Sequence, residues 1–349
     1  MASIRQVAQR AGTSVATVSR ALNGHAQVNE ETRRRVLDAA ARMGYKAAVG
    51  KRSTTVIGLA YPGDPVRPDY GAFESALLAG VLRGLNELRF DLNVINLQRD
   101  KRAEETYTQF FNRKGLRGVI LRTFERARPM CAEVAAEGFP HVVVADRFDE
   151  PFVNYVCCES KGDSQRAVEH LIDLGHKRIA LVVHDVADTD HRDRREGYEA
   201  AMVEHGLGID PGLVIETTAS MEGGARAMTR LLGMPNPPTA VYLTDPMAML
   251  GAIRRCQELS VRLPADLSLV GFDDSDVRKH VWPPVTAVCQ DAEMIGYEAS
   301  LWLTRRLSGR AEESIRMVRQ TMLDIGRTTG APPANPVRVL PDGTRLARA

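Results

Sequence analysis

Apolar residues recur with two different periods along the chain. Near the N-terminus they fall at three- and four-residue spacing, as at Ile4, Val7, Ala8 and Ala11, which predicts short amphipathic helices. From about residue 55, short apolar runs alternate with longer amphipathic stretches, the pattern of βαβ units in parallel sheets. Strands are expected at 56–60, 92–95, 118–121, 141–145, 155–158, 179–183, 240–244 and 267–270. Helices are expected at 72–88, 103–111, 164–174, 193–205, 224–232, 246–259 and 294–307.

The N-terminal pattern indicates a helix-turn-helix unit. Gly12 can adopt the positive φ that ends the first helix, and Ser14 is placed to cap a second helix. That second helix should carry Val15, Val18 and Leu22 inward, and a third helix is expected over 30–43. In such units the second helix lies in the DNA major groove.

A long, ungapped set of residues in this stretch carries a family resemblance. The set is Val7-Ala8, Ala11-Gly12, Ser14-Val15-Ala16-Thr17-Val18-Ser19-Arg20, Leu22-Asn23, Val28, Glu31-Thr32-Arg33, Val36 and Gly44-Tyr45. It resembles the opening of the lactose-repressor/galactose-repressor (LacI/GalR) family of transcription regulators. The resemblance implies that the second helix reads an operator in double-stranded DNA.

The residue types on the second helix divide the expected DNA contacts. Val15 and Ala16 can read only shape and thymine methyls, whereas Arg20 can bind a guanine through two hydrogen bonds. The short polar side chains suit phosphate contacts, which position the protein without specifying sequence. For each of these side chains, the alternative is a capping or intrahelical hydrogen bond. The short polar residues are Ser14, Thr17, Ser19 and Asn23.

Charge separates the head from the body. Residues 1–55 carry ten Lys and Arg side chains against three acidic ones, a net charge of +7, whereas the whole chain carries +2. The remainder therefore sums to −5, and a basic head on an acidic body suits phosphate binding. The linker, 47–55, departs from the family pattern because it is short and lacks the usual Pro-Asn and hinge Leu. We expect it to be extended, with Lys51 and Arg52 touching phosphates or the minor groove.

Polar side chains that follow the predicted strands indicate a ligand cleft, because doubly wound sheets bind ligands outside the carboxyl ends of their strands. These strand ends include Tyr61, Asp146, Asp245 and Asp273. Further family motifs are Ala167-Val168-Glu169-His170-Leu171, Leu174-Gly175-His176-Lys177-Arg178-Ile179-Ala180, Val270-Gly271-Phe272-Asp273-Asp274 and Pro283-Pro284-Val285-Thr286. They resemble the effector-binding body of the same family, which is shared with periplasmic sugar-binding proteins. Position by position, the resemblance implicates Asp146, Asp190, Arg194, Asp245, Asp273 and Gln290.

The expected organisation is a small all-α helix-turn-helix head and an α/β periplasmic-binding-protein-like body of two doubly wound parallel-sheet subdomains. The boundaries are a head at 1–46, a linker at 47–55, a first lobe at 56–158 plus 290–324, and a second lobe at 159–289. The tail, 325–349, is expected to end in a small hairpin or in disorder, with disorder favoured over the hairpin.

These features predict a cytoplasmic, homodimeric repressor whose effector is a sugar or a sugar derivative. A capping or salt-bridging role is the alternative for each cleft Asp.

No P-loop, nucleophile elbow, metal cluster or dinucleotide loop is present, so neither catalysis nor a cofactor is expected. No apolar run is long enough for a membrane span. Five scattered cysteines favour buried, reduced thiols. The rival functions are a ligand-independent DNA-binding protein and a solute receptor.

Overall fold

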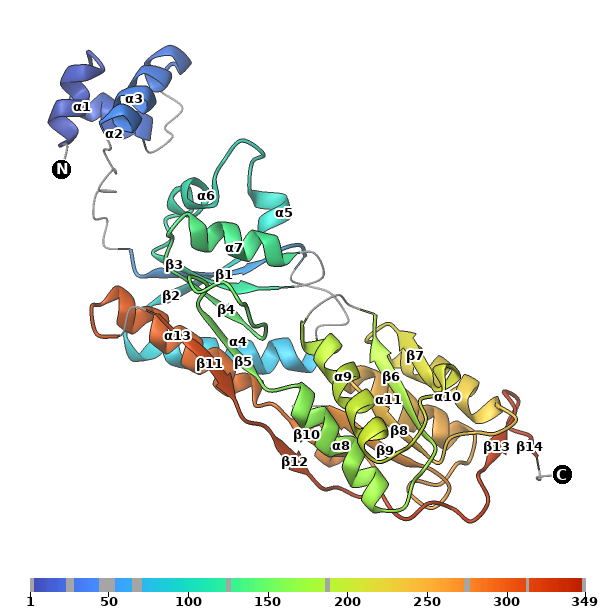
Figure 1. Cartoon of the computed structure of the whole chain (residues 1–349). Coiled ribbons are helices and arrows are strands. Elements are labelled where there is room, and N and C mark those ends of the chain that lie inside the picture. The colour runs from blue at the N-terminus through green and yellow to red at the C-terminus, as the bar shows by residue number, and fades with distance from the viewer. Residues whose placement is uncertain are drawn as a thin grey trace.

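A computed structural model describes residues 3–22, 28–43, 54–64, 71–123, 127–185, 189–272, 277–311 and 314–346. The head is a three-helix unit built from α1 (Ile4–Arg10), α2 (Val15–Leu22) and α3 (Glu30–Arg42) (Figure 1). Val7, Val18 and Val36 are completely buried at its centre. The predicted helix-turn-helix is confirmed.

Local capping chemistry sets the ends of the head helices. Gly12 adopts φ +60° after α1, as predicted, and Asn29 Oδ1 accepts a hydrogen bond from Thr32 N at 2.8 Å at the start of α3. The inward placement of Val15 is wrong, since 41% of this residue is exposed. Ala21 fills the core instead, because Val15 is the first helical residue and lies beside the turn.

The body contains two six-stranded sheets, ordered β11-β5-β4-β3-β1-β2 and β12-β10-β9-β8-β6-β7. Neighbours pair in parallel except for β10 with β12. The first sheet comprises β1 (Val56–Tyr61), β2 (Asp91–Asn96), β3 (Gly118–Arg122), β4 (His141–Val144), β5 (Tyr155–Cys158) and β11 (Arg316–Arg319). The second comprises β6 (Ile179–His184), β7 (Val214–Thr217), β8 (Ala240–Leu243), β9 (Ser268–Phe272), β10 (Thr286–Cys289) and β12 (Met322–Asp324).

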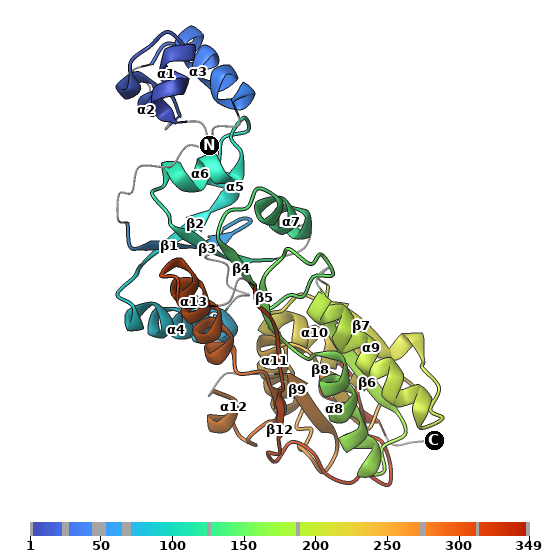
Figure 2. The same ribbon diagram turned by 60° about the vertical axis from the view of Figure 1, so that its left-hand side comes forward.

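Helices cover both faces of each sheet, as the doubly wound prediction requires. Around the first sheet they are α4 (Gly71–Glu87), α5 (Leu97–Asp100), α6 (Tyr107–Arg113), α7 (Arg128–Ala136) and α13 (Ala292–Leu307). Around the second they are α8 (Lys161–Asp173), α9 (Thr189–Glu204), α10 (Met221–Gly233), α11 (Pro246–Glu258) and α12 (Val277–His280). Figures 1 and 2 show α4 and α13 side by side on one face of the first sheet.

We call the two sheets with their helices the first lobe and the second lobe. The chain crosses between them after β5, after β10 and after β11. The expected division placed residues 322–324 in the first lobe, but β12 pairs with β10 in the second sheet. The difference arises because the last crossing comes directly after β11. Within the described residues, no helix combines the length and the apolar composition needed to cross a bilayer.

The adjacent residues Cys157 and Cys158 show that β5 contributes side chains to the hydrophobic cores on both faces of the first sheet. Cys157 packs with Phe111 and Cys131 on one face, and Cys158 packs with Val168 on the other. The two side chains point in opposite directions, because successive strand residues alternate between the two faces of a sheet. Both thiols are buried and free.

The C-terminal tail is ordered as far as Leu346, so the favoured expectation of disorder is wrong. Residues 338–339 (β13) and 345–346 (β14) form an antiparallel hairpin. Val339 is completely buried in the core beneath α10, and Arg345 forms an ion pair with Asp266 at 3.1 Å. Burial of one apolar side chain and several cationic contacts hold a segment whose own sequence is only weakly strand-forming.

Replacing Val339 with Ala is expected to lower the free energy of unfolding by about 2 kcal/mol, because the truncation leaves a cavity in the second-lobe core. Urea denaturation followed by circular dichroism measures the change. Val318→Ala, at a strand position that is 46% exposed, is the matched control and should change stability by less than about 0.5 kcal/mol. Equal effects of the two substitutions would show that the tail does not stabilise the fold.

A buried histidine joins the second sheet to the segment after β12. His176 Nδ1 lies 2.9 Å from Thr239 Oγ1, and its Nε2 lies 3.1 Å from Ser268 Oγ and 2.9 Å from the Gly330 carbonyl oxygen. Desolvation lowers the pKa of His176. The residue belongs to the motif 174–180, so part of that motif has a structural role.

Stability is expected to fall as the pH drops below about 6.5, the ordinary histidine pKa. In the unfolded chain His176 takes up a proton near that pH, whereas the lowered pKa in the folded state delays protonation, so acid favours unfolding. Urea unfolding at pH 7.5, 6.5 and 5.5 measures this. His176→Gln should cost about 1–3 kcal/mol at pH 7.5 and flatten the profile. The exposed His205→Gln control should leave the profile unchanged; a wild-type profile retained in His176→Gln would contradict the prediction.

Candidate DNA-binding face and effector cleft

The outer face of α2 presents the predicted base-reading residues. Val15, Ala16 and Arg20 are all exposed, and Ala16 and Arg20 lie one helical turn apart. An apolar side chain that is 41% exposed at the helix start offers methyl groups to a partner surface. The three side chains therefore form one accessible strip with a single cation.

The polar residues of α2 have different roles. Ser14 Oγ accepts a hydrogen bond from Thr17 N at 3.0 Å and lies 2.8 Å from Thr17 Oγ1, so Ser14 caps the helix. Ser19 is half-buried. Asn23, Lys51 and Arg52, which complete the predicted DNA contacts, lie outside the described residues. The capping alternative therefore holds for Ser14.

At the carboxyl edge of the first sheet, Tyr61 belongs to a buried ionic cluster. Its hydroxyl donates to Glu74 Oε2 at 2.9 Å. Arg122, at the end of β3, donates two hydrogen bonds to Glu74 Oε1 and a third to the Val144 carbonyl oxygen. This cluster ties α4 to the ends of β1, β3 and β4, on the first-lobe side of the predicted cleft.

Asp146 lies next along this edge and is completely buried. Its carboxylate accepts from Arg128 Nη1 at 2.5 Å and from the backbone N–H of Arg147 at 2.9 Å. The Arg128 guanidinium also donates to the Arg147 carbonyl oxygen and lies over the Phe148 ring at 4.2 Å. The loop after β4 is therefore held in one arrangement by α7.

In the second lobe, Arg194 is the centre of the wall predicted to bind the effector. Its guanidinium donates to the Thr244 carbonyl oxygen at 2.8 Å, lies 3.5 Å from Gln290 Oε1 and covers the Phe272 ring at 3.9 Å. Asp190 lies 4.0 Å away, one turn earlier on α9. Arg194, Asp190 and Gln290 are each buried. The structure thus brings together three of the predicted effector residues.

Gln290 connects this wall to a crossing segment. The Cys158 thiol donates to Gln290 Oε1 at 3.1 Å, at the point where β5 leaves the first sheet. Burial raises the pKa of the Cys158 thiol well above its usual value. The thiol therefore remains neutral and acts as a hydrogen-bond donor.

Asp245 has a structural contact that fits the capping alternative. Its Oδ1 accepts from Met247 N at 2.8 Å and from Ala248 N at 3.0 Å, so it caps α11. Burial raises its pKa, and the capping hydrogen bonds oppose that shift. Asp273, the last predicted residue of the cleft, lies outside the described residues.

An ion pair joins the two lobes beside the predicted cleft. Arg147, from the first lobe, lies 2.7 Å from the buried carboxylate of Asp193 on α9. Burial raises the pKa of Asp193, and the Arg147 charge lowers it. The pair connects the Asp146 cluster to the helix that carries Arg194, so the two walls are electrostatically coupled.

Several cleft residues were missed as effector-site residues from sequence, namely Glu74, Arg122, Arg128, Asp193 and Cys158. Only Arg122 carried a usable signal, since it is a charged residue directly after a continuous apolar run. Arg128 and Asp193 lie within helices, where charged residues are ordinary. Their role comes from the partner that each one meets across space.

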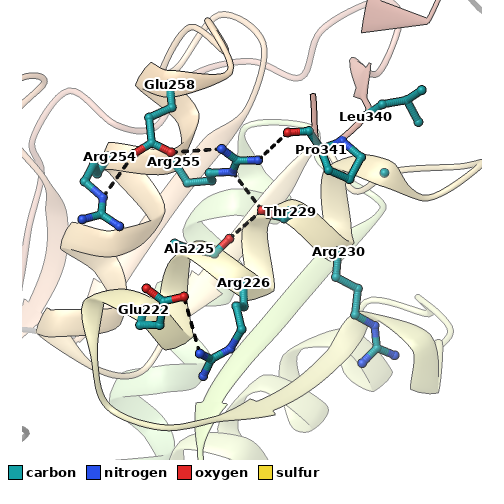
Figure 3. Close-up of a pocket in the computed structure, with 11 residues that line it drawn as sticks. Glu222, Ala225, Arg226, Thr229, Arg230, Arg254, Arg255, Glu258, Leu340 and Pro341 are labelled. Carbon is teal, nitrogen blue, oxygen red and sulfur yellow. Dashed lines mark hydrogen bonds and ion pairs between the residues drawn. The ribbon is translucent and has the colours of Figure 1, made fainter. Parts of the chain in front are cut away.

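A separate hollow lies on the outer side of the second lobe, between α10 and α11 (Figure 3). It has a volume of about 600 Å³ and a rim that includes Pro341 of the tail. Arg255 is held there by Thr229 Oγ1, Glu258 and the Pro341 carbonyl oxygen. None of the predicted effector residues that the structure describes lines this hollow.

Comparison with known proteins places these features in a family. Residues 3–47 match the model for bacterial regulatory proteins of the lacI family, and residues 168–329 match a periplasmic binding protein-like domain. The HTH-type transcriptional regulator DegA of Bacillus subtilis is 30% identical over 331 residues, covering 92% of this chain and 94% of DegA. The chain belongs to the LacI family.

This LacI-family protein is therefore a DNA-binding transcription regulator, and the predicted head and periplasmic-binding-protein-like body are confirmed. A solved complex of the transcriptional regulator CelR with cellobiose is 28% identical, with a TM-score of 0.69, and covers 94% of this chain and all of that one. The lac repressor dimer bound to operator shares the fold at 23% identity, with a TM-score of 0.66, and covers 95% of this chain and 99% of that one. These relatives are named as regulators, not as enzymes.

Proposed function

We propose that this regulator is a homodimeric, cytoplasmic repressor whose operator affinity is controlled by a sugar or sugar derivative bound between the two lobes. The observation that carries the proposal is the buried group of Asp190, Arg194 and Gln290, whose helix, α9, is joined to the loop of Asp146 by the ion pair of Arg147 with Asp193. Fixed carboxylates, a guanidinium and an amide supply the donors and acceptors that vicinal hydroxyls need. The CelR–cellobiose complex supports this ligand class.

The cleft also supports a mechanism. The two lobes already meet at the predicted cleft, where Arg147 and Asp193 form an ion pair. A ligand that contacts both walls favours one lobe arrangement, and it shifts the population only by its difference in affinity for the two arrangements. In a dimer, a change in lobe arrangement alters the spacing of the two heads relative to the half-sites.

Selection of bound DNA from a random pool, repeated with candidate ligands, tests the regulator part of the proposal. We expect enrichment of a two-fold symmetric site, because each head of a dimer reads one half-site. A thermal-shift panel of sugars and nucleosides tests the ligand class, since a true effector raises the melting temperature by mass action. Enrichment of DNA without any stabilising ligand would favour the ligand-independent alternative.

A further inference from the structure

Cationic side chains gather at the edge of the first lobe where the head joins the body. Thr55 O accepts from Asp91 N at 2.7 Å, and Val56 O accepts from Arg117 N at 2.9 Å, so this edge surrounds the end of the linker. Arg117 Nη2 also donates to the Leu307 carbonyl oxygen at 2.7 Å, which brings the end of α13 to the same edge. In Figure 1 the start of β1 and the end of α13 lie on the same side of the lobe.

Four arginines define what we call the linker-proximal face, namely Arg89, Arg117, Arg306 and Arg310. Arg89 follows α4, and Arg310 follows α13. Arg89, Arg117 and Arg310 are exposed, and Arg306 is half-buried over the Trp302 ring at 5.8 Å. Within the described part of the chain, neither Arg89 nor Arg310 forms an ion pair.

Acidic residues near this face offset part of its positive charge. Asp91 accepts a hydrogen bond from the Thr55 hydroxyl at 2.9 Å, and Glu87 bonds to the Tyr297 hydroxyl and lies 3.9 Å from Arg305. Glu312 and Glu313, which follow Arg310 closely in sequence, lie outside the described residues. The residues after 55 carry a net charge of −5, so this concentration of arginines differs from the average of the body.

Chain length keeps this face near the DNA. Eleven residue steps separate Met43, next to α3, from Thr54, and an extended chain covers at most about 3.6 Å per step. The linker-proximal face therefore lies within about 40 Å of the end of α3 whenever the head is in the major groove. A cationic surface at that range is positioned to approach phosphates that flank the half-site.

We infer that the linker-proximal face is a second DNA-binding surface, which contacts backbone phosphates beside the half-site read by the head. The inference rests on the proposed function, because it requires the head to hold the chain on DNA. Arginine binds phosphate through planar, paired hydrogen bonds, and such contacts add affinity without adding sequence preference.

The test is the salt dependence of full-length protein binding to a duplex enriched by the wild-type protein, with a scrambled duplex of equal length alongside. Arg89→Ala combined with Arg310→Ala should lower the slope of log K against log salt by about 0.9 for each lost contact, hence about 2 per protomer. Affinity should fall by the same factor on both duplexes. Arg89→Glu combined with Arg310→Glu should lower the slope at least as much.

The matched control removes two exposed arginines from the far side of the second lobe, Arg226→Ala with Arg230→Ala on α10 (Figure 3). It changes net charge equally and should leave the slope unchanged. A wild-type slope in both Arg89/Arg310 variants, with unaltered melting temperature, overturns this inference alone. Failure of the wild-type protein to bind any duplex would instead overturn the proposed function.

Discussion

Replacing Arg20 with Ala is expected to remove most of the operator discrimination of this regulator. Arg20 is the cation on the exposed strip of α2. A bidentate contact from arginine to guanine contributes about 1–3 kcal/mol of discrimination, so two half-sites together lose about 2–6 kcal/mol. That range corresponds to roughly 30-fold to 10⁴-fold weaker binding to the selected operator relative to a scrambled duplex.

Fluorescence anisotropy at one fixed salt concentration, with both duplexes, measures this ratio. Arg10→Ala is the matched control, because Arg10 is an exposed arginine at the end of α1 and not on the strip. This substitution should weaken binding to both duplexes equally or to neither. If Arg20→Ala also weakened both equally, Arg20 would be a phosphate contact, and the specificity would come from Val15, Ala16 and DNA shape.

Replacing Arg194 with Lys should lower effector affinity by about 100-fold or more while operator binding without effector persists. Lysine keeps the charge but cannot hold the Thr244 carbonyl oxygen, Gln290 and the Phe272 ring together. A ligand hydroxyl that accepts from the guanidinium would lose a hydrogen bond to a charged donor, which costs about 1.5–3 kcal/mol, and the loss of two such bonds accounts for the 100-fold change. Arg194→Ala should in addition destabilise the fold by about 3–5 kcal/mol, because the buried Asp190 would lose its nearby cation.

Calorimetry with the compound selected by the thermal-shift panel measures affinity, and anisotropy with and without that compound measures the regulatory response. Arg195→Lys is the matched control, since Arg195 follows on the same helix and pairs at the surface with Glu199 and Glu216. It should leave both measurements unchanged. Undiminished effector affinity in Arg194→Lys would place the ligand away from the proposed cleft.

The head could be predicted from sequence because its structure depends on local contacts. Capping by Ser14 and Asn29 and the positive φ of Gly12 each involve residues within one helical turn. The exception is Val15, whose exposure depends on how α2 meets the rest of the head. Periodicity identifies an apolar face but does not say how far that face is covered.

The cleft shows the limit of the same approach. Strand ends pointed to Tyr61 and Asp146, because the carboxyl edge of a parallel sheet is a property of the fold class. Their partners Glu74 and Arg128 come from helices, and nothing in the sequence near those residues identifies the pairing. Asp245 illustrates the converse, since its position at a strand end also makes it a helix cap.

The sequence by itself determined the kind of protein: a helix-turn-helix head, a parallel α/β body and the positions along the chain where binding residues cluster. Periodicity, capping and strand-end polarity are local signals, and each can be recognised in the sequence without knowledge of the fold. Only the tertiary structure decided that Arg147 meets Asp193 across the lobes, that Val339 anchors the tail, and that Arg117 meets the end of α13. These contacts join residues far apart in sequence. No local sequence pattern predicts them, because each contact exists only once the fold brings its two partners together.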